Sequence, residues 1–180
     1  MAKLRVRAAL SAIAAGILIT IGGCTEQAPT GNSGPDAGPR FEKLELTEQV
    51  GSAGLQANSL RAEKLIGPEG GTLEIPGGHT LAFPAGALES PTRIRATVDS
   101  RYVGVDLQPE GLRFPVGNGP MLTISLAGAP ADQYSKLAVL YVAPSGAILE
   151  VLQSDADRAG STLSARLSHF SGYLAGGHRQ

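Results

Sequence analysis

Short apolar or alternating runs fill the chain from about residue 61 onward. The clearest alternation lies in 92–99, where Ile94, Ala96 and Val98 fall on one side and polar residues on the other. The same two-residue period recurs in 163–168. Because successive side chains of a strand point to opposite faces, this period predicts strands with one buried face.

Turn residues separate these runs at short intervals, as in all-β folds. Residues 137–143 are apolar at nearly every position, which predicts a strand covered on both faces. The pattern predicts an all-β domain, an antiparallel two-layer sandwich preceded by a signal peptide and a flexible linker. The predicted strands are 63–66, 72–75, 80–83, 92–99, 103–107, 112–114, 121–126, 137–143, 148–153, 163–168 and 170–175.

The N-terminal pattern is different. Residues 1–7 contain three basic residues and no acid, and residues 8–23 form an uncharged, mostly apolar run of sixteen. This order is typical of a secretory signal peptide, and the run is shorter than the roughly 20 residues of a membrane span. We therefore expect residues 1–23 to be a signal peptide, with an uncleaved anchor as the alternative.

The signal ends in Ile21-Gly22-Gly23-Cys24, which resembles the lipobox of bacterial lipoproteins. The resemblance implies cleavage before Cys24, diacylation of its thiol and acylation of the new amine by chains such as palmitate. Two or more chains anchor a protein stably, so the membrane is the first expected partner. The resemblance also implies the bacterial cell envelope, at the outer membrane or cell surface, because Thr25 rather than Asp follows Cys24. The alternative is an incidental Cys.

Between the anchor and the strands lies a segment without a clear period. Residues 25–40 contain three Pro, three Gly and no large apolar residue, a composition typical of a flexible tether. Residues 41–60 fit neither a helix nor a strand period, and we expect a weakly ordered lead-in. The predicted organisation is therefore signal peptide 1–23, lipidated Cys24 and linker 24–60, β-sandwich 61–176 and tail 177–180.

Composition excludes several classes of protein. Gly and Pro make up 20% of the chain, in keeping with a turn-rich fold. Removal of residues 1–23 leaves 12 Lys and Arg against 16 Asp and Glu, a net charge of −4, so no nucleic-acid partner is expected. A single Cys forms no internal disulfide. We expect no cofactor, since phosphate, dinucleotide and zinc motifs are absent from the sequence, and no small-molecule substrate is evident.

Weaker candidates for chemistry have simpler interpretations. Asp155 and Asp157 are too few for a calcium site, which needs six or more oxygens, and we expect a solvated loop. His79 follows a Gly-Gly turn and is expected at the surface, at the start of a strand. Arg93 and Arg95 are expected on a solvated sheet face.

Several phrases occur in the order found in the ZU-type domain, the β-sandwich of zonula occludens proteins, netrin receptors and ankyrins. The chain resembles this family, most closely its short bacterial surface versions, over about residues 63–176. Members mostly bind other proteins, so the resemblance implies an interaction module with an unknown protein or envelope partner. The phrases are Gly70-Gly71-Thr72, Phe83-Pro84-Ala85-Gly86-Ala87-Leu88, Pro109-Glu110-Gly111-Leu112-Arg113-Phe114 and Leu122-Thr123-Ile124.

One motif near the C-terminus carries potential chemistry. His169-Phe170-Ser171, followed by the aromatic Tyr173, resembles the self-cleavage motif found beside ZU-type domains in the PIDDosome scaffold and in a self-cleaving nucleoporin. The resemblance implies attack of the Ser171 hydroxyl on the Phe170 carbonyl, an N-to-O acyl shift followed by hydrolysis. His169 would activate the hydroxyl, since serine is a weak nucleophile without a base, and residues i and i+2 of a strand share a face.

The alternation also changes phase at this motif. Odd positions up to Leu167 and even positions from Phe170 are predicted to face inward, so we expect a bulge or bend near Ser168. The alternative is that the motif simply belongs to the last core strand, with Phe170 packed inside. We take a non-catalytic interaction module as the first hypothesis and self-cleavage as the second. Carbohydrate adhesion is third, disfavoured because the chain has no Trp.

Overall fold

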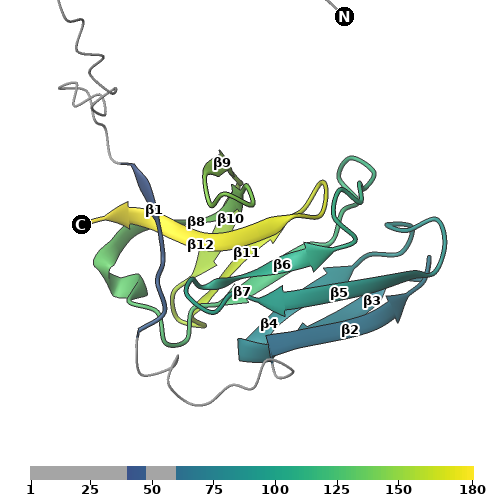
Figure 1. The fold of residues 1–180 in the computed structure, drawn as a ribbon, viewed down its shortest axis with the longest axis horizontal. Coiled ribbons are helices and arrows are strands. Elements are labelled where there is room, and N and C mark those ends of the chain that lie inside the picture. The colour runs from purple at the N-terminus through teal and green to yellow at the C-terminus, as the bar shows by residue number, and fades with distance from the viewer. Residues whose placement is uncertain (1–39, 48–59) are drawn as a thin grey trace, which may run out of the picture. The chain divides into compact units, whose positions relative to one another are not determined.

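A computed structural model describes residues 40–47 and 60–180 of the chain. It shows two antiparallel sheets packed as a sandwich, which confirms the predicted fold class (Figure 1). The expected signal peptide, Cys24 and most of the expected linker lie outside the described residues. Within the described ranges, no helix is long and apolar enough to cross a membrane.

The larger sheet has seven strands in the order β2-β5-β6-β12-β8-β9, and β1 pairs with the C-terminal half of β12. All neighbouring strands in this sheet are antiparallel. Its strands are β1 Phe41–Lys43, β2 Arg61–Ile66, β5 Thr92–Val98, β6 Gly104–Gln108, β8 Tyr134–Val142, β9 Ile148–Val151 and β12 Gly172–Arg179.

The smaller sheet has five strands in the order β10-β11-β7-β4-β3. Two short 3-10 turns, Pro76–Gly78 and Ala131–Gln133, each lead directly into a strand. The strands of this sheet are β3 Gly71–Ile75, β4 His79–Phe83, β7 Met121–Ser125, β10 Ser154–Asp157 and β11 Thr162–Arg166.

The core fills the space between the two sheets with the inward side chains of both. Ile94 and Ala96 of β5 and Leu163 and Ala165 of β11 are buried there, as their alternation predicted. Three rings, those of Phe83, Phe114 and Phe170, pack edge to face with centroids 5.1–6.1 Å apart. The main core and the strand pairings lie between Phe41 and Arg179, so residues 24–180 contain the complete described fold.

A second apolar cluster lies on the outer face of the larger sheet. Leu140, Val142 and Leu174 are buried there, beneath the partly buried rings of Phe41 and Tyr102. The inward residues of β8 belong to the main core. β8, the strand predicted to be apolar on both faces, is therefore covered on both faces. It lies next to the edge strand β9 rather than at the centre of the sheet.

Both ends of the domain extend further than the sequence suggested. The expected lead-in contains β1, where Phe41 pairs with His178 and Lys43 with Gly176. The expected tail 177–180 belongs to β12 as far as Arg179. The sheet therefore extends beyond residues 61–176. The three residues of β1 are too few to show a period, and Gly177 and His178 pair with both β1 and β8.

Three smaller predictions are also corrected. Residues 112–114 form no strand, and only Arg113 makes a bridge, to His169. Asp155 and Asp157 lie in strand β10 rather than in a loop. His79 is buried, not at the surface, and its Nδ1 accepts a hydrogen bond from the Ser125 backbone N–H at 3.0 Å.

Candidate functional site

The His169-Phe170-Ser171 motif lies where the chain passes from one sheet to the other. Strand β11 ends at Arg166 in the smaller sheet, and β12 begins at Gly172 in the larger one. The chain bends at Ser168, as the change of phase predicted. The predicted switch of inward-facing positions from odd to even is wrong beyond Phe170, because Tyr173 and Ala175 of β12 face the main core and Leu174 lies in the outer cluster. A second bend at Ser171 separates Phe170 from these residues.

The His169 side chain is directed toward Ser168 and Tyr141 rather than toward Ser171. Its Nδ1 lies 3.1 Å from the Ser168 hydroxyl, and its ring packs edge to face on Tyr141 at 4.8 Å. Its backbone carbonyl accepts a 2.7 Å hydrogen bond from the hydroxyl of Tyr173. Burial raises the pKa of Tyr173 and keeps this donor protonated.

Phe170 and Ser171 are held by the chain that leads out of β6. Phe170 is fully buried; its N–H donates to the Leu112 carbonyl, and its carbonyl accepts from the Gly111 N–H at 3.0 Å. The Ser171 carbonyl accepts from the Leu107 N–H. Gly111 has a φ of +75°, a conformation that favours glycine. The peptide bond proposed for cleavage is therefore firmly hydrogen-bonded on its oxygen.

His169 and Ser171 line two different depressions. His169 and Tyr173 border one beside β10 and β11, whereas Ser171 opens into one on the outer face of the larger sheet. Among the described residues, no hydrogen bond joins the two side chains. His169 and Ser171 are therefore close in the sequence, but their side chains do not form the hydrogen-bonded pair of base and nucleophile that self-cleavage needs.

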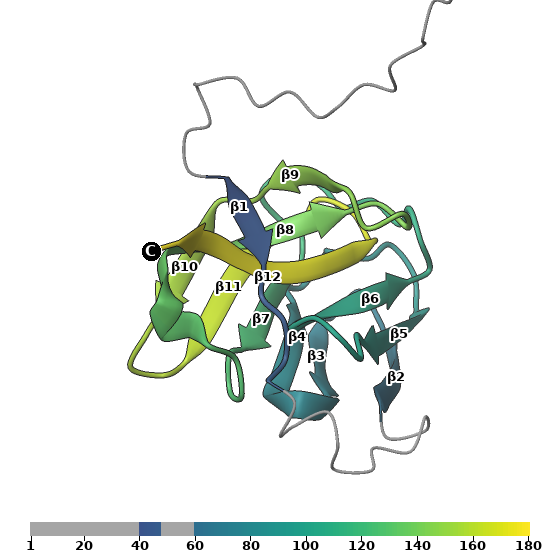
Figure 2. The same ribbon diagram turned by 60° about the vertical axis from the view of Figure 1, so that its left-hand side comes forward.

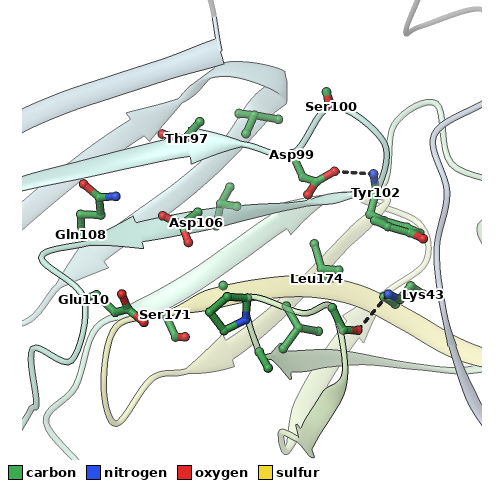
Figure 3. Close-up of a pocket in the computed structure, with 17 residues that line it drawn as sticks. Lys43, Thr97, Asp99, Ser100, Tyr102, Asp106, Gln108, Glu110, Ser171 and Leu174 are labelled. Carbon is green, nitrogen blue, oxygen red and sulfur yellow. Dashed lines mark hydrogen bonds between the residues drawn. The ribbon is translucent and has the colours of Figure 1, made fainter. Parts of the chain in front are cut away.

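The depression at Ser171 is a cleft of about 560 Å³, here called the outer-face cleft (Figure 3). It runs across β5, β6, β12 and β8 and is walled by the loops 99–102 and 143–146. Aliphatic side chains, including Val142 and Leu174, line its floor. Gly172 keeps the floor open, since a Cβ there would lie 3.2 Å from a methyl carbon of Val142.

The two ends of the outer-face cleft differ in charge (Figure 3). Asp106, Glu110 and the Ser171 hydroxyl lie at one end, and Lys43 and Tyr102 lie at the other. Loss of hydration in the cleft raises the pKa of Asp106, a hydrogen bond from the Gln108 side chain partly offsets this, and the nearby Glu110 charge raises it further.

A second surface of interest is the outer edge strand β9. Ile148, Leu149 and Val151 are 36%, 55% and 42% exposed, which makes this strand the largest group of exposed aliphatic residues described. β9 pairs with β8 on one side and is the last strand of its sheet on the other (Figure 2). Its outer backbone groups are therefore open to another strand.

Of the weaker sequence candidates, Arg93 and Arg95 lie on an exposed face as expected, and both pair with Glu63. These two side-chain hydrogen bonds lower the pKa of Glu63. Within 40–47 and 60–180, no group of three or more His, Cys, Asp or Glu side chains is arranged to hold a metal ion.

Sequence reasoning missed the outer-face cleft entirely. Its polar residues come from β1, the β5–β6 region and the start of β12, and no local motif connects them. The signal for β9 was visible as the phrase Ile148-Leu149-Glu150-Val151, but the phrase alone does not separate an exposed edge from a buried strand.

The chain matches no family model and none of the curated proteins with which it was compared. The class that the structure defines is an all-β protein with two antiparallel sheets.

Proposed function

We propose that this protein is a lipid-anchored cell-envelope protein whose ZU-type β-sandwich serves as a non-catalytic interaction module. The anchor is supported by the signal-like segment 1–23 and the lipobox-like residues before Cys24. The module is supported by the ordered phrases shared with ZU-type domains and by a fold of the kind that they imply. The partner is a protein that contributes an extended segment.

The observation that carries this proposal is the exposed apolar edge of β9. Leu149 and Val151 offer aliphatic side chains, and the free edge offers unpaired backbone donors and acceptors. An extended segment of a partner adds to such an edge as another strand, with its affinity coming from main-chain hydrogen bonds and its specificity from side-chain contacts.

The outermost strands β2, β3 and β10 carry charges that disfavour strand addition, and the one on β3 is the exposed Glu74. β2 presents Arg61, Glu63 and Lys64, which are exposed or partly exposed, and β10 presents two exposed aspartates. Charged side chains are the usual means of protecting an edge strand. β9 lacks this protection apart from Glu150, so it is the edge best suited to a partner.

A cross-linking pull-down from the native envelope tests the module. We expect Leu149→Lys to remove a cross-linked partner that the wild-type protein captures, because a charge at this edge disfavours an added strand. Leu65→Lys is the matched control, since Leu65 is a 60% exposed leucine on the opposite edge of the same sheet. Equal capture by wild-type protein and both variants would argue against the β9 edge.

Self-cleavage between Phe170 and Ser171 is the second candidate function. One observation favours it: the Gly111 N–H already donates to the Phe170 carbonyl, the oxygen on which negative charge would develop during attack. The contacts of His169 with Ser168 and Tyr141 do not favour it, because they direct the expected base elsewhere.

The intact mass of residues 24–180, produced with Cys24→Ser, separates the two functions. Self-cleavage predicts a slow loss of the full-length mass and release of a fragment beginning at Ser171, both absent in Ser171→Ala. The interaction module predicts one full-length species that persists through long incubation. Persistence of that species excludes the second candidate.

A further inference from the structure

The acidic end of the outer-face cleft lacks a positive partner. Among the described residues, neither Asp106 nor Glu110 takes part in an ion pair. Asp106 and Glu110 lie at the same end of the cleft (Figure 3). Partial burial is the main cause that raises the pKa of Asp106, and the charge of Glu110 adds to it, while a hydrogen bond from the Gln108 side chain lowers it. Two neighbouring carboxylates in a cleft attract a cation that relieves their repulsion.

Ser171 adds an observation that is independent of these charges. Its side chain is more than nine-tenths buried and opens into the same end of the cleft. Within the described part of the chain, its hydroxyl has no hydrogen-bond partner. Because no fully buried side-chain polar atom of the described residues lacks a hydrogen-bond partner, this hydroxyl is open to the cleft and accessible to a ligand donor.

At the opposite end of the cleft, Lys43 shows how the protein holds a primary ammonium group. Lys43 Nζ donates to the Gly146 carbonyl at 2.9 Å and lies 4.6 Å from the centre of the Tyr102 ring. The protein thus places its own ammonium group against a carbonyl and an aromatic face. Lys43 is engaged at this end and, within the part of the chain that the structure describes, is the only basic side chain that lines the cleft.

We propose that the outer-face cleft binds a primary ammonium group carried on a short aliphatic stem. The ammonium lies between Asp106 and Glu110 and donates to the Ser171 hydroxyl. The stem lies over the aliphatic floor at Val142 and Leu174. The ammonium belongs to a free alkylamine or to a lysine side chain of a partner.

Charge and shape together select this chemistry. Asp99 also lines the cleft, although its carboxylate is engaged with the backbone N–H groups of Arg101 and Tyr102. An anion would meet three carboxylates and is disfavoured. A bare inorganic cation would leave the aliphatic floor uncovered, whereas a stem of four or five methylenes covers it. This inference is independent of the β9 edge.

Titration of the 15N-labelled protein, residues 24–180 with Cys24→Ser, measures binding by NMR. The probe is 1,5-diaminopentane, with 1-pentanol as the neutral control and glutarate as the anionic one. We expect saturable shifts of Asp106, Glu110 and Gly172 amides with a dissociation constant on the order of 1 mM, as befits a ligand of few atoms. Affinity falls as salt rises.

Substitutions identify the groups responsible. Asp106→Asn and Glu110→Gln each weaken binding about three- to tenfold, since each removes one charge facing the ammonium. Ser171→Ala weakens it about twofold by removing one acceptor. Glu74→Gln, an exposed carboxylate on β3 of the other sheet, is the matched control and leaves binding unchanged.

A second arm separates the two sources of the ammonium group. A blocked tripeptide, acetyl-Gly-Lys-Gly-amide, carries the same ammonium and stem on a peptide backbone. Binding of the diamine alone supports a site for free amines, and binding of both supports a site that also accepts a lysine side chain. The proposal is overturned by absent saturation, by equal shifts with 1-pentanol, or by carboxylate variants that bind the diamine as well as Glu74→Gln does.

Discussion

At the scale of single residues, position in the fold decides the role more than residue type does. His79 and His169 differ little in the sequence, yet His79 is buried against β7 and His169 lies partly exposed beside Tyr141. Ser171 was singled out as a nucleophile, and the structure places its hydroxyl in a cleft beside two carboxylates instead of against the expected histidine.

His79 gives the first prediction. Burial lowers the pKa of His79, so the folded protein keeps it neutral while the unfolded chain binds a proton below about pH 6.5. Stability is therefore fully present above that pH and falls as the pH is lowered toward 5.

Urea unfolding between pH 5 and 8 measures this dependence. His79→Gln should be less stable than wild type at pH 8, because the bond to Ser125 is altered, but should lose less stability on acidification. One proton corresponds to a slope of about 1.4 kcal/mol per pH unit. An unchanged slope in the variant would show that His79 is not the group responsible.

At the scale of elements, the sequence predicted what alternation and turns encode locally. Most strands appear close to their predicted positions because inward and outward residues differ in polarity over five or more positions. β1 and β10 were missed because each has only three or four residues and is ordered by a distant strand. The polar residues of the cleft were missed for the same reason: only the pairing of β6 with β12 brings Asp106 opposite Gly172.

The attachment of β1 gives the second prediction. A Cβ at Gly176 would lie 2.2 Å from Leu140 Cδ1 and 2.7 Å from the Glu42 carbonyl oxygen. The leucine side chain can move, but the β1 backbone must shift, so Gly176→Ala should loosen β1 from β12. We expect hydrogen exchange at the Leu44 amide, bonded to the Ala175 carbonyl, to accelerate about tenfold.

The Ile124 amide in β7 serves as the internal control, because β7 lies in the other sheet. Its exchange should change much less than that of Leu44. Equal acceleration at both amides would indicate general destabilisation and would contradict a local role for Gly176 in holding β1.

At the scale of the whole molecule, the described fold begins at Phe41, only sixteen residues after Thr25. From the composition of residues 25–40 we expect a flexible tether with a root-mean-square reach of roughly 20–25 Å. The proposed anchor would make partners in the same envelope the ones to look for at the β9 edge and the outer-face cleft.

Lipidation gives the third prediction. When the full chain is expressed in bacteria fed an alkyne fatty acid, we expect label on the processed, membrane-bound protein. Cys24→Ser should carry no label and should keep residues 1–23, because the proposed processing needs the lipidated thiol. Label that persists in this variant, or its absence from wild type, would contradict the anchor.

The most direct test of the interaction module is site-specific photo-crosslinking in living cells. A photoreactive phenylalanine analogue is placed at position 149 of the anchored full-length protein and, as the control, at position 65 on the opposite edge. We predict a discrete cross-linked protein species from position 149 that position 65 does not yield. No cross-linked protein from position 149, or the same species from both positions, would contradict the proposal that β9 receives a partner.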